Sequence, residues 1–435
     1  MNKTTRLAAK HPLILGGVSA ANIGSNFLFQ WLVLTMLGPG MLTDALFASM
    51  TAPQLFTTIV SSSLTHVMVP LLVGESYRDQ RSDAWTFFGC GAAIFSAAAG
   101  VLIASAAWWV PLTVPGFSLE AKVATVDLAR ISLLGLVLTG TSAVQVALSF
   151  ARNDYIWPDT ASMLANVVAV LLLIWFLPRF GVWAAAWISV LRLFLQSALL
   201  LPLLGQPCLP DLTRPTIRIA WLRLKPILLG ASYYKLDPLV DRYLLSTAAA
   251  GSLSLLYLAQ QLLAAASQVV SKALAVPVIT QLASAYKQGD QAQFASRLTR
   301  TLWIMLGVCS AGVIVLWLVG QPLLAWSMVH GRFTAVDARE LWVLLLLCAG
   351  MLVAGALGTL TAGAFYAQGD TRTPTLLGSL AFTLGIGLKV ATFSYYGVRG
   401  LALAISVYFL ASLFIQWLVL SRRGAMRPFA PRAKL

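Results

Sequence analysis

Long apolar stretches follow one another along almost the whole chain, and they limit what it can fold into. A helix that spans a bilayer needs about 20 consecutive apolar residues. Hydrophobic residues make up 59% of the 435 residues and charged residues 10%, against roughly 25% charged in soluble domains. The expected spans are 12–37, 43–73, 84–110, 122–150, 157–178, 181–204, 219–247, 251–285, 297–327, 338–367, 374–396 and 398–420. We therefore predict an all-α polytopic membrane protein with twelve transmembrane helices.

The net charge of +15 is spread unevenly over the predicted loops. Lys and Arg are concentrated near both termini and in every second loop, as at Arg78, Arg81, Arg214 and Arg218, whereas the loops between hold few. The positive-inside rule then places both termini in the cytoplasm of a bacterial inner membrane. The charge is therefore a topology signal, and no nucleic-acid partner is expected.

The two halves of the chain resemble each other. Pro158 and Pro374 are 216 residues apart, each at the start of an apolar stretch, and Gly181 and Gly397 are also 216 residues apart. Because each half holds six expected spans, both halves have the same orientation in the membrane. This pattern predicts two six-helix lobes related by a parallel pseudo-two-fold repeat.

The predicted domain organisation follows from the repeat. Residues 1–205 form the N-lobe, the proline-rich segment 206–217 is a cytoplasmic linker, and residues 218–435 form the C-lobe with a short basic tail. Two lobes that meet at one cleft favour a transporter that works by alternating access, although a channel or a structural protein can also contain such a repeat.

Nothing in the sequence indicates an enzyme, a cofactor or a metal site. The four cysteines show no paired spacing, so neither disulfides nor metal ligands are predicted. The sequence has no Gly-rich phosphate loop with a following Lys-Ser/Thr, no HExxH and no GxSxG. Energy for transport would then come from an ion gradient, the membrane potential or consumption of the product.

Polar side chains in the first expected span suggest a substrate cavity. Asn22, Asn26 and Gln30 are spaced i, i+4, i+8 and share one helix face. Their amides donate and accept hydrogen bonds, which suits sugar hydroxyls. The alternative is that they hydrogen-bond to neighbouring helices. Arg192, in the middle of span 181–204, is assigned to the same cavity.

The eighth expected span adds three polar residues on one face. Gln261, Gln268 and Lys272 follow i, i+7, i+11 spacing. We predict that the two amides line the cavity. Lys272 either attracts a pyrophosphate as a point charge or extends its ammonium to the membrane interface.

Two segments resemble the lipid II flippase family (MurJ/MviN). They contain Gly331-Arg332-Phe333-Thr334 followed by Asp337, and Phe365-Tyr366 followed by Asp370-Thr371-Arg372-Thr373-Pro374, while the run 40–47 with Asp44, then Pro53, resembles the start of that family's second helix. The resemblance covers essentially the whole chain. It implies the fold of the multidrug/oligosaccharidyl-lipid/polysaccharide exporter superfamily and a polyprenyl-pyrophosphate-linked saccharide as substrate within the lipid bilayer.

The chain also departs from this family. The positions that correspond to the family's cavity arginines hold Ile23, Phe29, Thr57 and Gln261, and the sequence stops after the twelfth span, where the family usually has two more helices. We therefore predict a flippase for the precursor of an exopolysaccharide or related envelope polymer, acting as a monomer. The alternatives are lipid II for peptidoglycan, a drug/cation antiporter of the same superfamily, and a non-transporting scaffold.

Charged residues within the seventh and eleventh spans suggest how transport is coupled. A charge at the bilayer centre costs at least about 2.5–3.5 kcal/mol, so these groups are expected to face the cavity or each other. Some members of the resembled family bind sodium among their seventh, eleventh and twelfth helices. Here we predict that Lys389 replaces the ion and pairs with Asp237, or less favourably with Asp241, near Lys235.

Overall fold

The computed structural model describes residues 3–72, 77–211 and 213–422, and every regular element among them is helical. The α-helices are α1 (Lys3–Leu37), α2 (Met41–Ser49), α3 (Thr51–Leu72), α4 (Tyr77–Ala104), α5 (Ala106–Thr113), α6 (Leu119–Ala151), α7 (Ile156–Leu200), α8 (Pro215–Ser232), α9 (Asp237–Leu245), α10 (Ser252–Val270), α11 (Val276–Lys287), α12 (Gln291–Met328), α13 (Ala335–Leu347), α14 (Ala349–Ala367) and α15 (Arg372–Arg422). Short elements are η1 (Leu201–Leu204), η2 (Tyr234–Leu236) and the π-helical η3 (Ser271–Ala275). The prediction of an all-α polytopic membrane protein is confirmed. Among the described residues, 7 helices are long and apolar enough to span a membrane, and the count of twelve spans stays a prediction.

Helices α7 and α15 are each a hairpin of two helical arms. Gly181 has φ 54° and ψ −138°, and Gly397 has φ 58° and ψ −141°, a left-handed backbone that glycine adopts readily. In a straight helix Asn166 and Arg192 would be roughly 39 Å apart at about 1.5 Å per residue. Their side chains instead meet at 3.0 Å, so the arms of α7 fold back on each other. In α15 the corresponding contact is between Lys389 and the Tyr408 ring, at 5.0 Å.

The repeat predicted from the sequence recurs in the local structure. The turn before α7 is capped by Asp154, whose Oδ1 accepts from the Ile156 and Trp157 backbone N–H groups. The turn before α15 is capped by Asp370 in the same way, through the N–H groups of Arg372 and Thr373. Carboxylates at helix N-termini satisfy backbone donors that have no partner within the helix.

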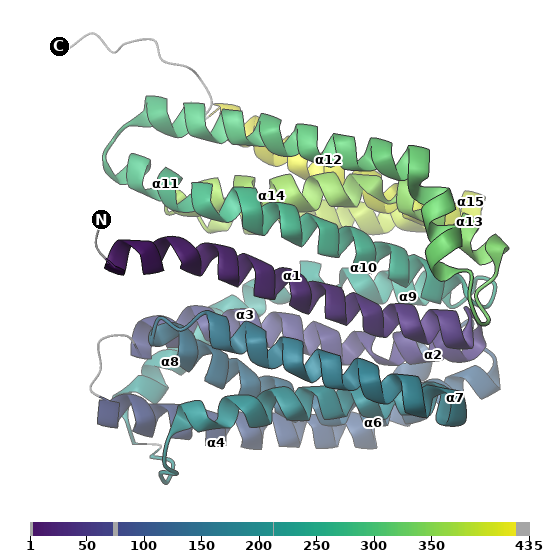
Figure 1. The fold of residues 1–435 in the computed structure, drawn as a ribbon, viewed down its shortest axis with the longest axis horizontal. Helices are drawn as coiled ribbons and strands as arrows, with labels where there is room; N and C mark the ends of the chain where they lie inside the picture. The colour runs from purple at the N-terminus through teal and green to yellow at the C-terminus, as the bar shows by residue number, and fades with distance from the viewer. Residues whose placement is uncertain (1–2, 73–76, 212, 423–435) are drawn as a thin grey trace. The chain divides into compact units, whose positions relative to one another are not determined.

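The chain forms two compact units, each with its own packing. Unit 1 comprises Met1–Ser254 and His330–Phe333, and here α1 packs along α7 while α3 and α4 pack on α6 (Figure 1). Unit 2 comprises Leu255–Val329 and Thr334–Leu435, where α14 packs on α15, α11 and α12. Small buried residues of α6, such as Ala143 and Ala147, allow close helix packing.

Helices α8 and α9 belong to unit 1 because they pack on α3 and α5. The boundary between the units therefore follows Ser254, whereas the sequence repeat divides at the linker. The lobes 1–205 and 218–435 with linker 206–217 stay a prediction.

Candidate functional site

A cluster of polar side chains joins α1 to both arms of α7 inside unit 1. The Asn22 side-chain oxygen accepts hydrogen bonds from Asn166 at 2.7 Å and from Ser162 at 3.1 Å. The Arg192 guanidinium donates from Nη1 to Asn26 Oδ1 at 2.6 Å and to Asn166 Oδ1 at 3.0 Å. Both acceptors are neutral amides, and these two hydrogen bonds orient the guanidinium. The hydrogen bonding between helices is thus confirmed, and the cavity role of these residues stays a prediction.

Arg192 also lies against an aromatic ring of α1. Its Cζ atom is 5.9 Å from the centre of the Phe29 ring, within reach of a cation–π contact. Phe29 is one of the positions at which the family resemblance led us to expect an arginine. The positive charge that α1 lacks at this position is supplied by α7. The neighbouring Gln30 is 7% exposed, and its Oε1 has no hydrogen-bond partner among the described residues.

A second cation, Lys235, bonds beside another position at which the resemblance led us to expect an arginine. Lys235, in η2, donates a hydrogen bond from Nζ to the Thr58 carbonyl oxygen of α3 at 3.1 Å. Thr58 follows Thr57, where the resemblance also led us to expect an arginine. Unit 1 therefore holds one basic group beside Phe29 and another that bonds to the residue after Thr57.

Asp44, a residue of the family motif, connects α2 to the first turn of α10. Its Oδ2 accepts from the Gly251 N–H at 2.7 Å, and its Oδ1 accepts from the Ser254 N–H at 2.7 Å and from the Ser254 hydroxyl. The side chain is 3% exposed. A carboxylate at this place satisfies unpaired donors of the helix N-terminus and interacts favourably with the helix dipole.

The motif 331–333 contacts the end of α1. The Arg332 N–H donates to the Thr35 carbonyl oxygen at 2.9 Å. Gly331 has φ 64°, and a Cβ atom there would lie 2.5 Å from the same oxygen, so only glycine fits. Phe333 is 2% exposed and anchors the turn. An equivalent contact joins Gly116, whose N–H donates to the Ser246 hydroxyl at 3.1 Å at the end of α9.

The motif 365–374 shapes a turn rather than a binding surface. Phe365 is fully buried, and its carbonyl oxygen accepts from the Asp370 N–H. Asp370 then caps α15 through Arg372 and Thr373, as described above. The remaining motif residues are found on the same turn and at the helix starts: Tyr366, Thr371 and Pro374 here, and Pro53 near the start of α3.

The predicted coupling residues are divided between the units. Lys389, in unit 2, is fully buried and lies against Tyr408. Asp237 and Asp241 belong to unit 1, so the predicted pair with Lys389 stays a prediction. Asp241 is 2% exposed and Arg242 is 3% exposed, so both side chains are buried.

The cavity residues predicted on the eighth span lie in unit 2. Gln261 is partly buried, whereas Gln268 and Lys272 are exposed on the surface of that unit. Lys272 lies in the π-helical η3, which immediately precedes Val276-Pro277. A proline lacks the N–H that continues a regular helix, which accounts for the local change in winding.

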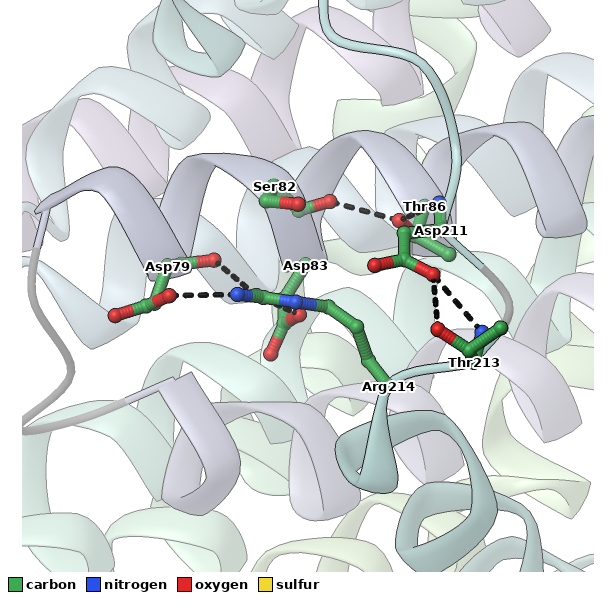
Figure 2. A network of polar contacts seen from close by, with 7 residues as sticks. All are labelled: Asp79, Ser82, Asp83, Thr86, Asp211, Thr213 and Arg214. Atoms are coloured by element: carbon green, nitrogen blue, oxygen red, sulfur yellow. Dashed lines mark hydrogen bonds and ion pairs between the residues drawn. The ribbon is translucent and has the colours of Figure 1, made fainter.

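The linker is held against α4 by a network that the sequence analysis missed (Figure 2). Arg214 donates to Asp83 Oδ1 at 2.5 Å and to Asp79 Oδ1 at 2.6 Å. These hydrogen bonds raise the pKa of Arg214 above its ordinary value. Asp211 is bonded through its N–H to Thr86, and hydrogen bonds from Thr213 hold the pKa of the Asp211 carboxyl below its usual range.

The two acidic partners of Arg214 differ in burial, which gives a testable difference in stability. The Asp83 side chain is 1% exposed and that of Asp79 53%. We expect Asp83→Ala to lower the free energy of unfolding by about 2 kcal/mol, because it removes a buried carboxylate that pairs with the partly exposed Arg214. Asp79→Ala should cost less than about 1 kcal/mol, as exposed pairs do. Thermal unfolding of both variants in detergent measures this, and equal losses would contradict it.

Asn166 and Ser162 were also missed by the sequence analysis, although they complete the Arg192 cluster. The sequence did indicate Asn166, because it is an amide within an apolar span, where a polar side chain needs a hydrogen-bond partner. Its partner lies 26 residues further along the chain, and only the hairpin turn at Gly181 brings the two together.

Comparisons with known proteins give a consistent result. The family model described as "Lipid II flippase MurJ" matches residues 33–431. The "Probable lipid II flippase MurJ" of Buchnera aphidicola subsp. Acyrthosiphon pisum is 22% identical over 412 residues, covering 92% of this chain and 80% of the relative. That of Bdellovibrio bacteriovorus is 22% identical over 397 residues, covering 87% and 75%.

Solved structures agree on the fold. A lipid II flippase MurJ in an inward closed conformation superposes with a TM-score of 0.80 at 16% identity, covering 97% of this chain and 88% of that one. An inward-facing multidrug resistance MATE family transporter gives 0.76 at 14% identity, covering 95% and 98%. Since the family match extends over nearly the whole chain, this protein belongs to the MurJ lipid II flippase family.

Proposed function

We propose that this protein moves lipid II, a polyprenyl-pyrophosphate-linked saccharide, from the cytoplasmic to the periplasmic leaflet of a bacterial inner membrane by alternating access. The observation that carries the proposal is the position of Arg192. Its guanidinium lies 5.9 Å from the Phe29 ring and is oriented by two neutral amides. Guanidinium groups bind phosphate oxygens with two parallel hydrogen bonds, which suits a pyrophosphate.

This geometry weakens the argument against lipid II. The preference for an exopolysaccharide precursor rested on missing arginines at four positions, which hold Ile23, Phe29, Thr57 and Gln261. Arg192 brings positive charge to the Phe29 position from another helix, and Lys235 bonds to the carbonyl oxygen of Thr58, the residue after Thr57. The family match and the names of the relatives also favour lipid II, which the sequence analysis held as its alternative. Likeness to MATE transporters at 14% identity supports the fold alone.

Growth rescue tests the substrate. If the protein flips lipid II, its expression at native level restores growth to cells depleted of their own lipid II flippase. Failure to rescue, together with loss of a surface polysaccharide when the gene is deleted, would favour the exopolysaccharide precursor instead. Transport of a cationic dye against a sodium or proton gradient would favour the antiporter.

We keep the predicted orientation as part of this proposal. Both termini and the linker 206–217 lie in the cytoplasm, because the loops on that side carry most of the Lys and Arg residues. The protein acts as a monomer with lobes 1–205 and 218–435.

Coupling is proposed to depend on a pair between Lys389 and Asp237. Lys389 is fully buried, and a buried lysine that loses an acidic partner is left with an uncompensated charge. We therefore expect Lys389→Ala and Asp237→Ala each to lower folded yield and transport more than the double variant does. Transport should not require sodium.

The comparison of these three variants, with and without sodium, measures both expectations. Strictly additive losses would exclude the pair, and strict sodium dependence of the unmodified protein would exclude replacement of the ion. Asp241→Ala serves as the control for the less favoured partner.

A further inference from the structure

A small cavity with both polar and apolar walls lies inside unit 1, between α3, α6 and the second arm of α7. Its volume is about 130 Å³, room for roughly four water molecules at about 30 Å³ each. Its polar lining consists of Thr57, Thr139, Ser142 and Gln196. This volume is too small for a whole sugar ring and fits one substituent of about four non-hydrogen atoms.

The two threonines offer acceptors to this cavity. The Thr57 hydroxyl donates to the Pro53 carbonyl oxygen at 2.9 Å, and the Thr139 hydroxyl donates to the Gly135 carbonyl oxygen at 3.0 Å. A hydroxyl has one hydrogen and two lone pairs. The two hydroxyls also lie 3.4 Å from each other. Because each hydrogen has an acceptor within the protein, what remains for a guest is the unused acceptor capacity of the two oxygens.

Ser142 offers the complementary donor. Its side chain is 7% exposed, and its Oγ has no hydrogen-bond partner among the described residues. A buried polar atom without a partner is unfavourable, and rotation of the serine side chain toward the cavity would let a ligand group that accepts a hydrogen bond satisfy it. Gln196, on the opposite wall, adds a side-chain amide that both donates and accepts.

The remaining walls are apolar and no charge faces the cavity. Ala143, Val146 and Leu193 complete the lining, and within the part of the chain that the structure describes no charged side chain takes part in it. A phosphate would find no cation there, and a cation would find no carboxylate. The cavity therefore suits a neutral group with one donor, one acceptor and a small apolar end.

We propose that this cavity receives the acetamido group of an N-acetylated sugar in the transported headgroup. The amide N–H donates to Thr57 or Thr139, the carbonyl oxygen accepts from Ser142, and the methyl group packs on the apolar wall. Gln196 follows Arg192 by four residues, so the two side chains lie on one face of the arm about 5–6 Å apart at Cβ. This inference rests on the proposed function, in which Arg192 binds the pyrophosphate to which the sugar is attached.

Three soluble probes test the proposal with the purified full chain in nanodiscs. They are farnesyl pyrophosphate, the same lipid carrying N-acetylglucosamine, and the same lipid carrying glucose, which has a hydroxyl in place of the acetamido group. Titration calorimetry should show about tenfold tighter binding of the N-acetylglucosamine probe than of the glucose probe, the effect of two neutral hydrogen bonds. Ser142→Leu, which fills the cavity, should abolish this preference, and Thr139→Val should reduce it to about threefold.

Thr141→Val is the matched control. Thr141 is also a buried threonine of α6 whose hydroxyl donates to its own helix, at 3.0 Å to the Val137 carbonyl oxygen, but it does not line the cavity. It should keep the tenfold preference. Equal binding of both sugar probes by the unmodified protein would overturn the acetamido site while leaving the proposed function intact. Binding of none of the pyrophosphate probes would overturn both.

Discussion

Replacing Arg192 with alanine is expected to lower lipid II transport at least tenfold in proteoliposomes while the protein stays folded. A hydrogen bond to a charged group contributes about 1.5–3 kcal/mol, so the loss of one guanidinium–phosphate contact accounts for a factor of ten or more. Folding should suffer less, because the groups that lose Arg192 are the neutral amides of Asn26 and Asn166. Asn166 also keeps its hydrogen bond to Asn22.

The contact with Phe29 allows a stronger test of the same prediction. If transport requires a positive charge beside Phe29, whichever helix carries it, Phe29→Arg in the Arg192→Ala background should restore part of the transport. Arg179→Ala is the control, since Arg179 is an exposed arginine of the same helix outside the cluster. Unchanged transport by Arg192→Ala would refute the assignment. If the double variant transports no better than Arg192→Ala alone, the arginine must be carried by α7.

Asp44→Ala is expected to destabilise the protein by about 3 kcal/mol and to abolish growth rescue. The side chain is 3% exposed and accepts three hydrogen bonds from Gly251 and Ser254. Its removal leaves buried backbone donors unpaired, each at a cost of about 1–3 kcal/mol. Thermal unfolding in detergent and the rescue assay measure the two effects.

Asp337→Ala is the control for Asp44. Asp337 also caps a helix, accepting from Thr334 within the same turn, so its loss should cost only about 1 kcal/mol. A loss of stability at Asp44 no larger than at Asp337 would mean that Asp44 is a local cap and nothing more. Asp44→Asn, which keeps one acceptor oxygen, should give an intermediate result.

The helices were predictable because hydropathy, glycine and proline act locally. Each expected span corresponds to one helix, to one arm of α7 or α15, or to two successive α-helices, with a short η element between them in 219–247 and 251–285. The boundary expected between 178 and 181 agrees with the turn at Gly181. The breaks at Met50 and before η2 were not foreseen. They depend on packing between helices that are distant in sequence.

The site was less predictable than the fold. Asn22, Asn26 and Arg192 were singled out as polar groups in apolar spans, but their positions in sequence gave no indication that Arg192 would lie beside Phe29. A comparison with the family pattern, position by position, shows that an arginine is missing from α1. It cannot show that an arginine on another helix takes the same place. The linker network was missed for the same reason, because Arg214 is 131 residues from Asp83.

The turn at Gly181 also bears on how the chain enters the membrane. An arginine on a single inserted helix costs at least about 2.5–3.5 kcal/mol at the bilayer centre. Asn166 and Arg192 lie on opposite arms of one hairpin and bond to each other at 3.0 Å. If the two arms leave the insertion machinery together, the guanidinium enters lipid with an acceptor already in place. The two arms of α7 then insert into the membrane together. A substitution at Gly181 that keeps the arms apart would prevent this insertion before the protein folds.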